Sequence, residues 1–362
     1  MKIDTGLWNI LLLSITIRAP FTLASPGDNL DEFIDCYDAC NYQRHCPDSE
    51  VDWYNPDENV FVKEKFAETP TILSKFLFWD CKADCDYQCQ QIITHIRIIQ
   101  DEEIYQFHGK WPFLRLFTMQ ELFSTVFSIG NFFPHYYSYI KITEKIDSIK
   151  RSGINVSKTR ILQNYLYVAI AGMCAWTAST IFHWRDLLIT EKFDYFFAGM
   201  TVLMGFHAIF ARLTHLDRFP RLGKYFSGSV AFIFGLHLLR LYIDWSYTYN
   251  MRFNIFFGIM QYLLLLTLAL QNYLYLKRER HIASGSKYMT QSKLIFKLCI
   301  VPVLLVVGTS MAMSLELFDF FLYDYQIDAH AIWHLCTIWP SWVLYSFFTD
   351  DYDLILTKQI KD

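Results

Sequence analysis

Three histidines stand where they could bind a metal ion together. His330 and His334 are four residues apart, and His183 is four residues after Ser179. Residues four apart lie one turn apart on the same face of a helix, so each pair points in one direction. Neutral imidazoles suit zinc, and three protein ligands leave a fourth tetrahedral position for water, as in catalytic zinc sites. This pattern predicts a zinc centre with His183, His330 and His334 as the metal ligands.

Two further polar residues could act on a water molecule at this centre. Asp194 follows His183 by eleven residues, and Ser179 precedes it by four. A zinc ion lowers the pKa of a bound water from about 15.7 to about 7. Asp194 could then accept or orient the proton, and Ser179 could hydrogen-bond the water or the developing oxyanion. We therefore expect Asp194 and Ser179 to be catalytic.

Other readings of these residues remain open. In a serine hydrolase, Ser179 would be the nucleophile, His183 the base and Asp194 its orienting carboxylate. That mechanism leaves the other two histidines unused, and Ser179 lies in a helical run rather than a G-x-S-x-G turn. A structural role is also open, because histidines at helix ends often bond only head groups or backbone. Rossmann and P-loop fingerprints are absent.

The composition indicates that helices crossing a membrane must position these residues. The chain has 362 residues, 53% hydrophobic content, 32 Phe and 23 Tyr. Apolar stretches of about 20 residues match the thickness of a hydrocarbon core. We expect an all-α membrane protein with a bundle of seven transmembrane helices: Leu114 to Tyr139, Ile161 to His183, Phe193 to Leu213, Tyr225 to Trp245, Phe253 to Leu276, Leu294 to Leu317 and His330 to Phe348.

The distribution of positive charge predicts the orientation of this bundle. Lysines and arginines are concentrated after the first, third and fifth apolar stretches, whereas the other connections are shorter or acidic. Positive loops are usually cytosolic, so the N-terminus would be lumenal and the C-terminus cytosolic. The three histidines would then lie near the lumenal ends of their helices. The sequon at Asn155 would lie in a cytosolic loop and should stay unglycosylated.

The segment before the bundle carries the marks of the secretory pathway. Residues 1–24 resemble a signal peptide, with Lys2, an apolar stretch and small residues near Ala24. Residues 25–110 form a predicted lumenal domain with an even number of cysteines, and in an oxidising compartment we expect three disulfides. The connectivity stays open, and a zinc knuckle is the alternative. The cysteines are Cys36, Cys40, Cys46, Cys81, Cys85 and Cys89.

These features set the predicted domain organisation and exclude one class of partner. The bundle would occupy residues 111–350, and residues 351–362 would form a cytosolic tail. The formal net charge of −4 and the lack of a long basic run exclude a nucleic-acid-binding protein.

Several of these motifs together resemble the Per1-like family of post-GPI-attachment phospholipases. They are Gln106 to Phe113, Ser179 to Asp186, Thr190 to Phe196, Asp328 to His334 and the cysteine-rich stretch Trp79 to Cys89. This family resembles the alkaline ceramidases and adiponectin-receptor-like proteins, which are seven-helix membrane hydrolases that hold zinc on three histidines beside a serine and an aspartate. The resemblance implies that Ser179, His183, Asp194, His330 and His334 form such a site.

The resemblance also implies a substrate. It would be the lipid of the anchor on GPI-anchored proteins, from which the sn-2 acyl chain is removed during anchor remodelling. A ceramidase-like amidase and a non-catalytic receptor for GPI-anchored proteins are the alternatives. Relatives divide between the endoplasmic reticulum and the Golgi, and we expect the endoplasmic reticulum membrane.

Overall fold

The computed structural model describes residues 25–47, 59–153, 159–278 and 291–361. The predicted signal peptide and the sequon at Asn155 lie outside these residues. The chain divides after Pro112 into two compact units.

The first unit is a small helical domain held by disulfides. Its helices are η1 (Pro26–Asn29), α2 (Asp31–Gln43), η2 (Val60–Lys63), α3 (Thr71–Leu77) and α4 (Cys81–Ile99). Disulfides join Cys36 to Cys89, Cys40 to Cys85 and Cys46 to Cys81, so α2 and α4 are stapled in antiparallel order.

These three bonds confirm the predicted disulfides, and they exclude the zinc knuckle because disulfide sulfurs are not thiolate ligands. Phe33, Ile93 and Phe107 fill the small core around the disulfides. A unit of this size buries little apolar surface, so covalent links contribute much of its stability.

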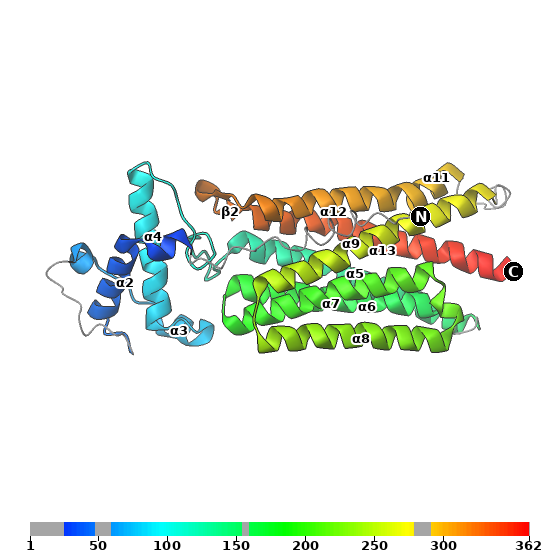
Figure 1. Ribbon diagram of the computed structural model, residues 1–362, viewed down its shortest axis with the longest axis horizontal. Coiled ribbons are helices and arrows are strands. Elements are labelled where there is room, and N and C mark those ends of the chain that lie inside the picture. The colour runs from blue at the N-terminus through cyan, green and yellow to red at the C-terminus, as the bar shows by residue number, and fades with distance from the viewer. Residues whose placement is uncertain (1–24, 48–58, 154–158, 279–290, 362) are drawn as a thin grey trace, which may run out of the picture. The chain divides into compact units, whose positions relative to one another are not determined.

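The second unit is a helical bundle (Figure 1). Its long helices are α5 (Leu122–Arg151), α6 (Arg160–Trp184), α7 (Leu188–Leu213), α8 (Pro220–Ile243), α9 (Tyr247–Arg278), α12 (Val301–Phe318) and α13 (Ala329–Lys361). Shorter elements are η4 (Leu216–Arg218), α11 (Gln291–Ile295), the π-helix η5 (Phe296–Ile300), β1 (Phe321–Leu322), η6 (Tyr323–Tyr325) and β2 (Ile327–Asp328).

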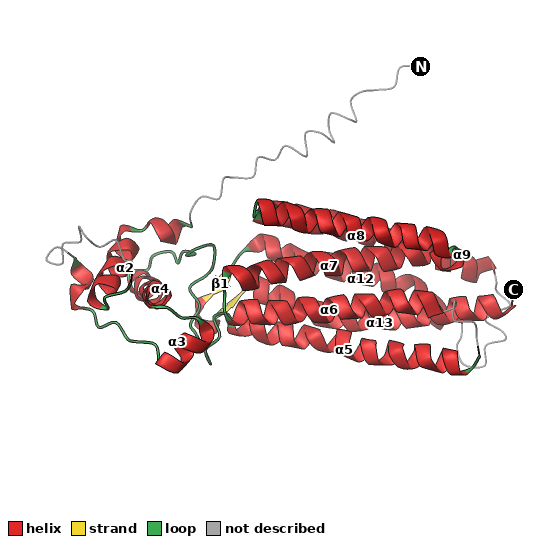
Figure 2. Ribbon diagram, turned by 90° about the horizontal axis from the view of Figure 1, so that it is seen from below, coloured by secondary structure: helices red, strands yellow, loops and turns green. Residues whose placement is uncertain are grey.

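Six of these helices form a closed ring and α8 lies outside it. The ring runs α5, α6, α7, α9, α12 and α13, which returns to α5. Figures 1 and 2 show α8 along the edge of the bundle beside α7. Inside the ring the Tyr165 and Phe348 rings stack with centroids 4.0 Å apart, which packs α6 against α13.

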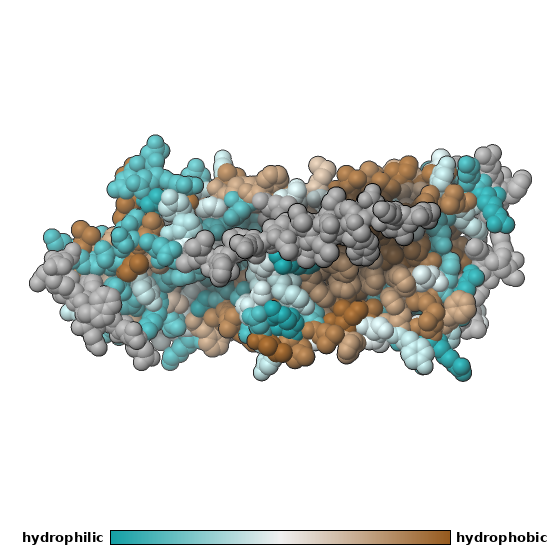
Figure 3. All heavy atoms as spheres, in the orientation of Figure 1, coloured by the Kyte–Doolittle hydropathy of each residue, from teal (hydrophilic) through white to brown (hydrophobic). Residues whose placement is uncertain are grey.

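The bundle is a multi-pass membrane domain by helix composition. Among the described residues, five helical segments are long and apolar enough to cross a membrane: α6, α7, α8, α9 and the segment Gln291–Leu315 that includes most of α12. Helices α5 and α13 have 30 and 33 residues, but they are too polar for this criterion. The face of the bundle in Figure 3 is largely hydrophobic, as contact with lipid requires.

The first helix of the bundle begins later than the sequence predicts. Its predicted start was Leu114, whereas α5 begins at Leu122 and continues beyond Tyr139 to Arg151. Phe117 and Thr118 have φ of 51° and 70°, which belong to the left-handed region and cannot continue a right-handed helix. An isolated bridge between Leu116 and Met119 makes a turn there instead.

The last helix continues into the segment expected to be a tail. Helix α13 runs to Lys361 without a break. Asp351 and Tyr352 are buried in the bundle. These residues of the expected tail therefore pack against the other helices.

Candidate metal centre

The three predicted histidine ligands come together between α6 and α13. His183 lies in the last turn of α6, and His330 and His334 lie in the first two turns of α13. Their ligand atoms all lie within 4.8 Å of one another. Nε2 of His330 and Nε2 of His334 are 2.9 Å apart. Because His183 and His334 are only 2% and 1% exposed, two of the three imidazoles are almost fully buried.

The carboxyl end of α6 is fixed by the chain that enters α5. A helix leaves its last carbonyls without partners inside the helix. The backbone N–H groups of Gln120 and Glu121 donate to the carbonyls of Trp184 and His183, at 3.1 Å each. This backbone pairing holds the turn that carries His183.

The Glu121 side chain fixes the orientation of the His183 ring. Its Oε2 lies 2.7 Å from Nδ1 of His183, and both side chains are buried. A carboxylate only accepts, so the Nδ1–H of His183 donates and the Nε2 lone pair is the one that can bind a metal. Carboxylates in this position are typical of metal-ligating histidines.

The Ser128 hydroxyl fixes the orientation of the His334 ring. Its hydroxyl donates to the Ser124 carbonyl at 2.7 Å and lies 2.9 Å from Nδ1 of His334. Since the one hydroxyl proton is used on Ser124, the Nδ1–H of His334 must donate to Ser128. Nε2 of His334 therefore also offers a lone pair to the shared space.

The donor set fits a metal such as zinc. Two imidazole nitrogens 2.9 Å apart need either a proton or a cation between them. His183 and His334 both present Nε2, and each has an oxygen acceptor on Nδ1. Three imidazoles, two of them with such outer partners, are a usual zinc-binding arrangement.

Helix α13 is held in place at its start and one turn further on. Asp328 accepts a hydrogen bond from the backbone N–H of Ala331 at 2.8 Å, which caps the helix. Burial raises the pKa of the Asp328 carboxyl to about 6. The Asn131 amide donates to the carbonyl of His334 at 2.7 Å, so α5 holds the backbone of this ligand as well as its ring.

Ser179 belongs to the same hydrogen-bonded group. Its hydroxyl lies 3.0 Å from that of Ser128, and it is 4% exposed. Ser128 already donates to Ser124, so Ser179 donates to Ser128 and keeps its own lone pairs. In the alternative serine triad Asp194 would orient His183, but here Glu121 bonds Nδ1 of that ring.

Asp194 lies on α7, outside the group of three histidines. It is half-buried. Arg212 follows it by eighteen residues on the same helix, which is five turns at 3.6 residues per turn, so the two residues share a face of α7. Because Arg212 bonds Asp351 of α13, this face looks into the bundle. The position of Asp194 is therefore compatible with a role at the interior site.

Two residues that orient the ligands escaped the sequence interpretation. Glu121 and Ser128 are single polar residues of no recognised motif. They belong, however, to a row of buried polar residues repeated every three or four positions along α5, which is the helical period. The row comprises Glu121, Ser124, Thr125, Ser128, Asn131, His135 and Ser138. Such a row on an apolar helix is a signal for a polar interior site.

The single histidines of the apolar helices have structural partners. Nε2 of His207 lies 2.8 Å from the Ser227 hydroxyl, which links α7 to α8. The His237 ring stacks on Phe253 of α9 with centroids 3.7 Å apart. These contacts give each of the two histidines a structural role.

The chain is similar to the Per1-like proteins over most of its length. The Per1-like family model matches residues 71–352, which include every residue of the site above. Protein PER1 of Saccharomyces cerevisiae is 58% identical over 344 residues, 94% of this chain and 96% of that protein. The PER1 homolog of Schizosaccharomyces pombe is 33% identical over 340 residues, 92% and 89% of the two chains.

A similarity to animal proteins covers nearly the same length. The GPI-specific phospholipase A2-like protein PGAP3 of Homo sapiens is 28% identical over 352 residues, 97% of this chain and 96% of that protein. No solved structure matches the chain.

Proposed function

Because this chain belongs to the Per1-like family, we propose that it is a membrane hydrolase that removes an acyl chain from the lipid of GPI anchors. Relatives that match 96% and 97% of its length are named GPI-specific phospholipase A2-like. The observation that carries the proposal is the convergence of His183, His330 and His334, with ligand atoms within 4.8 Å of one another. GPI-anchored proteins would be the substrates, and the sn-2 ester would be the bond cleaved.

Zinc is the metal that we propose for this site, with Nε2 of His183 and His334 and a nitrogen of His330 as ligands. When bound, zinc supplies a water of pKa about 7 and polarises the ester carbonyl. Glu121 and Ser128 keep the protons of the His183 and His334 rings on Nδ1, so the Nε2 lone pairs stay free to bind the metal. Burial of these rings excludes bulk water from the ligand atoms.

Asp194 and Ser179 would handle the proton and the developing charge. Hydrolysis adds the hydroxyl of water to the acyl carbon and a proton to the glycerol oxygen, which leaves a fatty acid and a lysolipid. Asp194 would take the proton from water and return it to the leaving oxygen. Ser179, whose own proton is directed to Ser128, would position the water through its lone pairs.

We base the proposed compartment and orientation on the distribution of positive charge and on the cysteine-rich segment. We propose that α5 and α13 also cross the membrane, so that seven helices span it. The site would then face the lumen of the endoplasmic reticulum, as would the disulfide-bonded unit, and residues 1–24 would be a cleaved signal peptide. Helix α5 tolerates its polar residues because its polar row faces protein rather than lipid.

Reconstituted protein with a GPI-anchored protein as substrate tests the activity. We expect wild-type protein to release fatty acid and leave a lysolipid anchor. Asp194→Asn should lower turnover by about 10²–10⁴-fold, the usual contribution of general acid–base catalysis, while zinc content stays the same. The matched control is Glu191→Gln, one turn earlier on α7.

Two results would contradict the proposal. Release of fatty acid from ceramide but not from the GPI lipid would indicate an amidase. Binding of GPI-anchored proteins without any release, by a wild-type protein that contains zinc, would indicate a receptor.

A further inference from the structure

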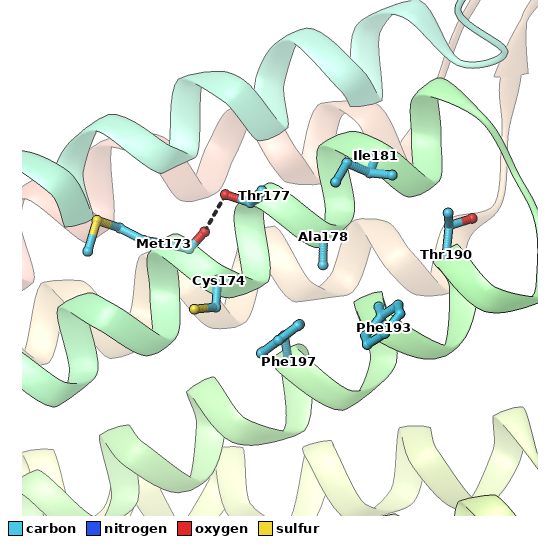
Figure 4. A pocket seen from close by; sticks show the side chains of 8 residues that line it. All are labelled: Met173, Cys174, Thr177, Ala178, Ile181, Thr190, Phe193 and Phe197. Atoms are coloured by element: carbon cyan, nitrogen blue, oxygen red, sulfur yellow. Dashed lines mark hydrogen bonds between the residues drawn. The ribbon is translucent and has the colours of Figure 1, made fainter. Parts of the chain in front are cut away.

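A second feature of the bundle lies on the other side of α6 from the histidines. It is a groove of about 330 Å³ between α6 and α7. Met173, Cys174, Thr177, Ala178 and Ile181 of α6 line it, with Thr190, Phe193 and Phe197 of α7. Figure 4 shows Cys174 and Ala178 directed toward Phe193 and Phe197 across the groove.

The groove residues of α6 lie on a different face of that helix from the metal centre. On a helix that turns 100° per residue, Ala178 and Ile181 lie on nearly the opposite side from Ser179 and His183. The ligand-bearing face of α6 is buried against α5 and α13. The groove face looks toward α7 and outward, and Ile181 remains 52% exposed.

The chemistry of the lining admits hydrocarbon and nothing polar. Six of the eight lining side chains are apolar or sulfur-containing. Both threonine hydroxyls are bonded to their own backbone: Thr177 donates to the Met173 carbonyl, and Thr190 to the carbonyls of Arg185 and Leu187. Neither hydroxyl proton is free for a ligand, so a ligand that needs a hydrogen-bond donor would lose its bonds to water without replacement.

The dimensions suit one chain of a bilayer lipid. Eight residues separate Met173 from Ile181, which is about 12 Å at 1.5 Å per residue. One leaflet contributes about 15 Å of the hydrocarbon core. Beyond Met173 and Phe197, α6 and α7 come close together, since the Thr201 hydroxyl lies 3.4 Å from the Ala171 carbonyl. The stacked rings of Phe193 and Phe197 form one wall.

We infer that this groove is a binding site for one acyl chain of a bilayer phospholipid, separate from the lipid that reacts. Both helices are candidate membrane spans, so hydrocarbon surrounds the open side of the groove. A chain in the groove fills the space between α6, which carries Ser179 and His183, and α7, which carries Asp194. It thereby supports the spacing of the two helices at the depth of the site.

Photo-crosslinking of the full chain in nanodiscs tests this inference. The probe is a phosphatidylcholine with a diazirine in its acyl chain, and the adducts are mapped by peptide mass spectrometry. We expect adducts concentrated on 173–181 and 193–197, in excess of those on the equally exposed residues of α8. Adducts spread evenly over α6, α7, α8 and α9 would overturn the inference, because they would show only general contact with lipid.

A second experiment repeats the crosslinking on a variant in which a larger side chain fills the groove. Ala178→Phe should reduce the groove adducts to the level measured on α8, whereas Leu236→Phe on the lipid-facing side of α8 should leave them unchanged. If Ala178→Phe does not fold, Cys174→Phe fills the same space. Undiminished adducts in a folded filled variant would overturn the inference.

Lipid binding in the groove does not depend on metal binding at the histidines. The His330→Ala, His334→Ala double variant should give the same groove adducts as the wild type, because the histidines lie on the opposite side of α6. Loss of the groove adducts in the folded double variant would contradict a separate site.

Discussion

The bundle contains two buried polar clusters that differ in how their charges are paired. One is the histidine group. The other joins Arg212 of α7 to Asp351 of α13, with Nε–Oδ2 and Nη2–Oδ1 distances of 2.5 and 2.9 Å, and Asn272 of α9 donates to Asp351 at 2.8 Å. Seventeen residues separate His334 from Asp351, about 26 Å along α13. The clusters therefore occupy opposite ends of the bundle.

The pairing in each cluster indicates its role. In the Arg212 cluster each charge faces its opposite and every bond joins two helices, so the cluster holds α7, α9 and α13 together. In the histidine cluster Glu121 and Ser128 occupy the outer nitrogens, and the inner nitrogens face one another across less than 4.8 Å. Burial of polar groups alone does not identify a metal site. Several lone-pair nitrogens directed at a common point do.

The largest effect on stability should come from breaking the paired cluster. Arg212→Ala leaves Asp351 buried without its cation, which costs about 3–5 kcal/mol. We expect a low yield of folded protein and a lower melting temperature in detergent, measured against Arg218→Ala, an exposed arginine nearby on the chain. The folded fraction should keep its zinc.

Replacing both Arg212 and Asp351 by apolar residues tests whether the loss of stability comes from the unpaired charge. Arg212→Met combined with Asp351→Leu should recover much of the lost stability, because a buried ion pair is often replaced by apolar residues at little cost. Loss of zinc from folded Arg212→Ala would show that the two ends are not independent.

Glu121→Gln should have the next largest effect. It removes the charge that holds the His183 proton on Nδ1, and loss of such a partner usually lowers metal affinity or activity by about 10–100-fold. Zinc affinity measured by competition with a chelator checks this. Glu144→Gln, on the exposed side of the same helix, should leave the affinity unchanged; equal affinities of both variants would refute the role of Glu121.

Ser128→Ala should have the smallest effect. It removes one neutral hydrogen bond from His334, so we expect zinc affinity to fall by about twofold to tenfold. Ser124→Ala is the control, because its backbone carbonyl, and not its side chain, accepts the Ser128 proton. A larger loss in Ser124→Ala than in Ser128→Ala would contradict the hydrogen-bond assignment.

The sequence predicted the parts of this site that obey local spacing rules. His330 and His334 share a helix face because they are four residues apart, and the six N-terminal cysteines were expected to form disulfides because their number is even and the compartment is oxidising. The sequence did not predict which cysteines pair, because the pairing depends on how α2 and α4 pack. It also did not predict the start of α5, because that start depends on the left-handed backbone of Phe117 and Thr118.

The residues that orient the ligands were missed for a related reason. Glu121 and Ser128 act on histidines 62 and 206 residues away in the sequence, and no local pattern records such contacts. The polar row on α5 reveals that this helix faces polar groups, but only the packed bundle shows which ones.

Zinc content per folded chain shows whether His183, His330 and His334 bind a metal ion. We would purify the wild type, the His330→Ala, His334→Ala double variant and His207→Ala, a control that removes a buried histidine with a structural partner. We expect about one zinc ion per chain in the wild type and the control, and none in the double variant. A folded wild type without metal, or a double variant that retains its zinc, would contradict this expectation.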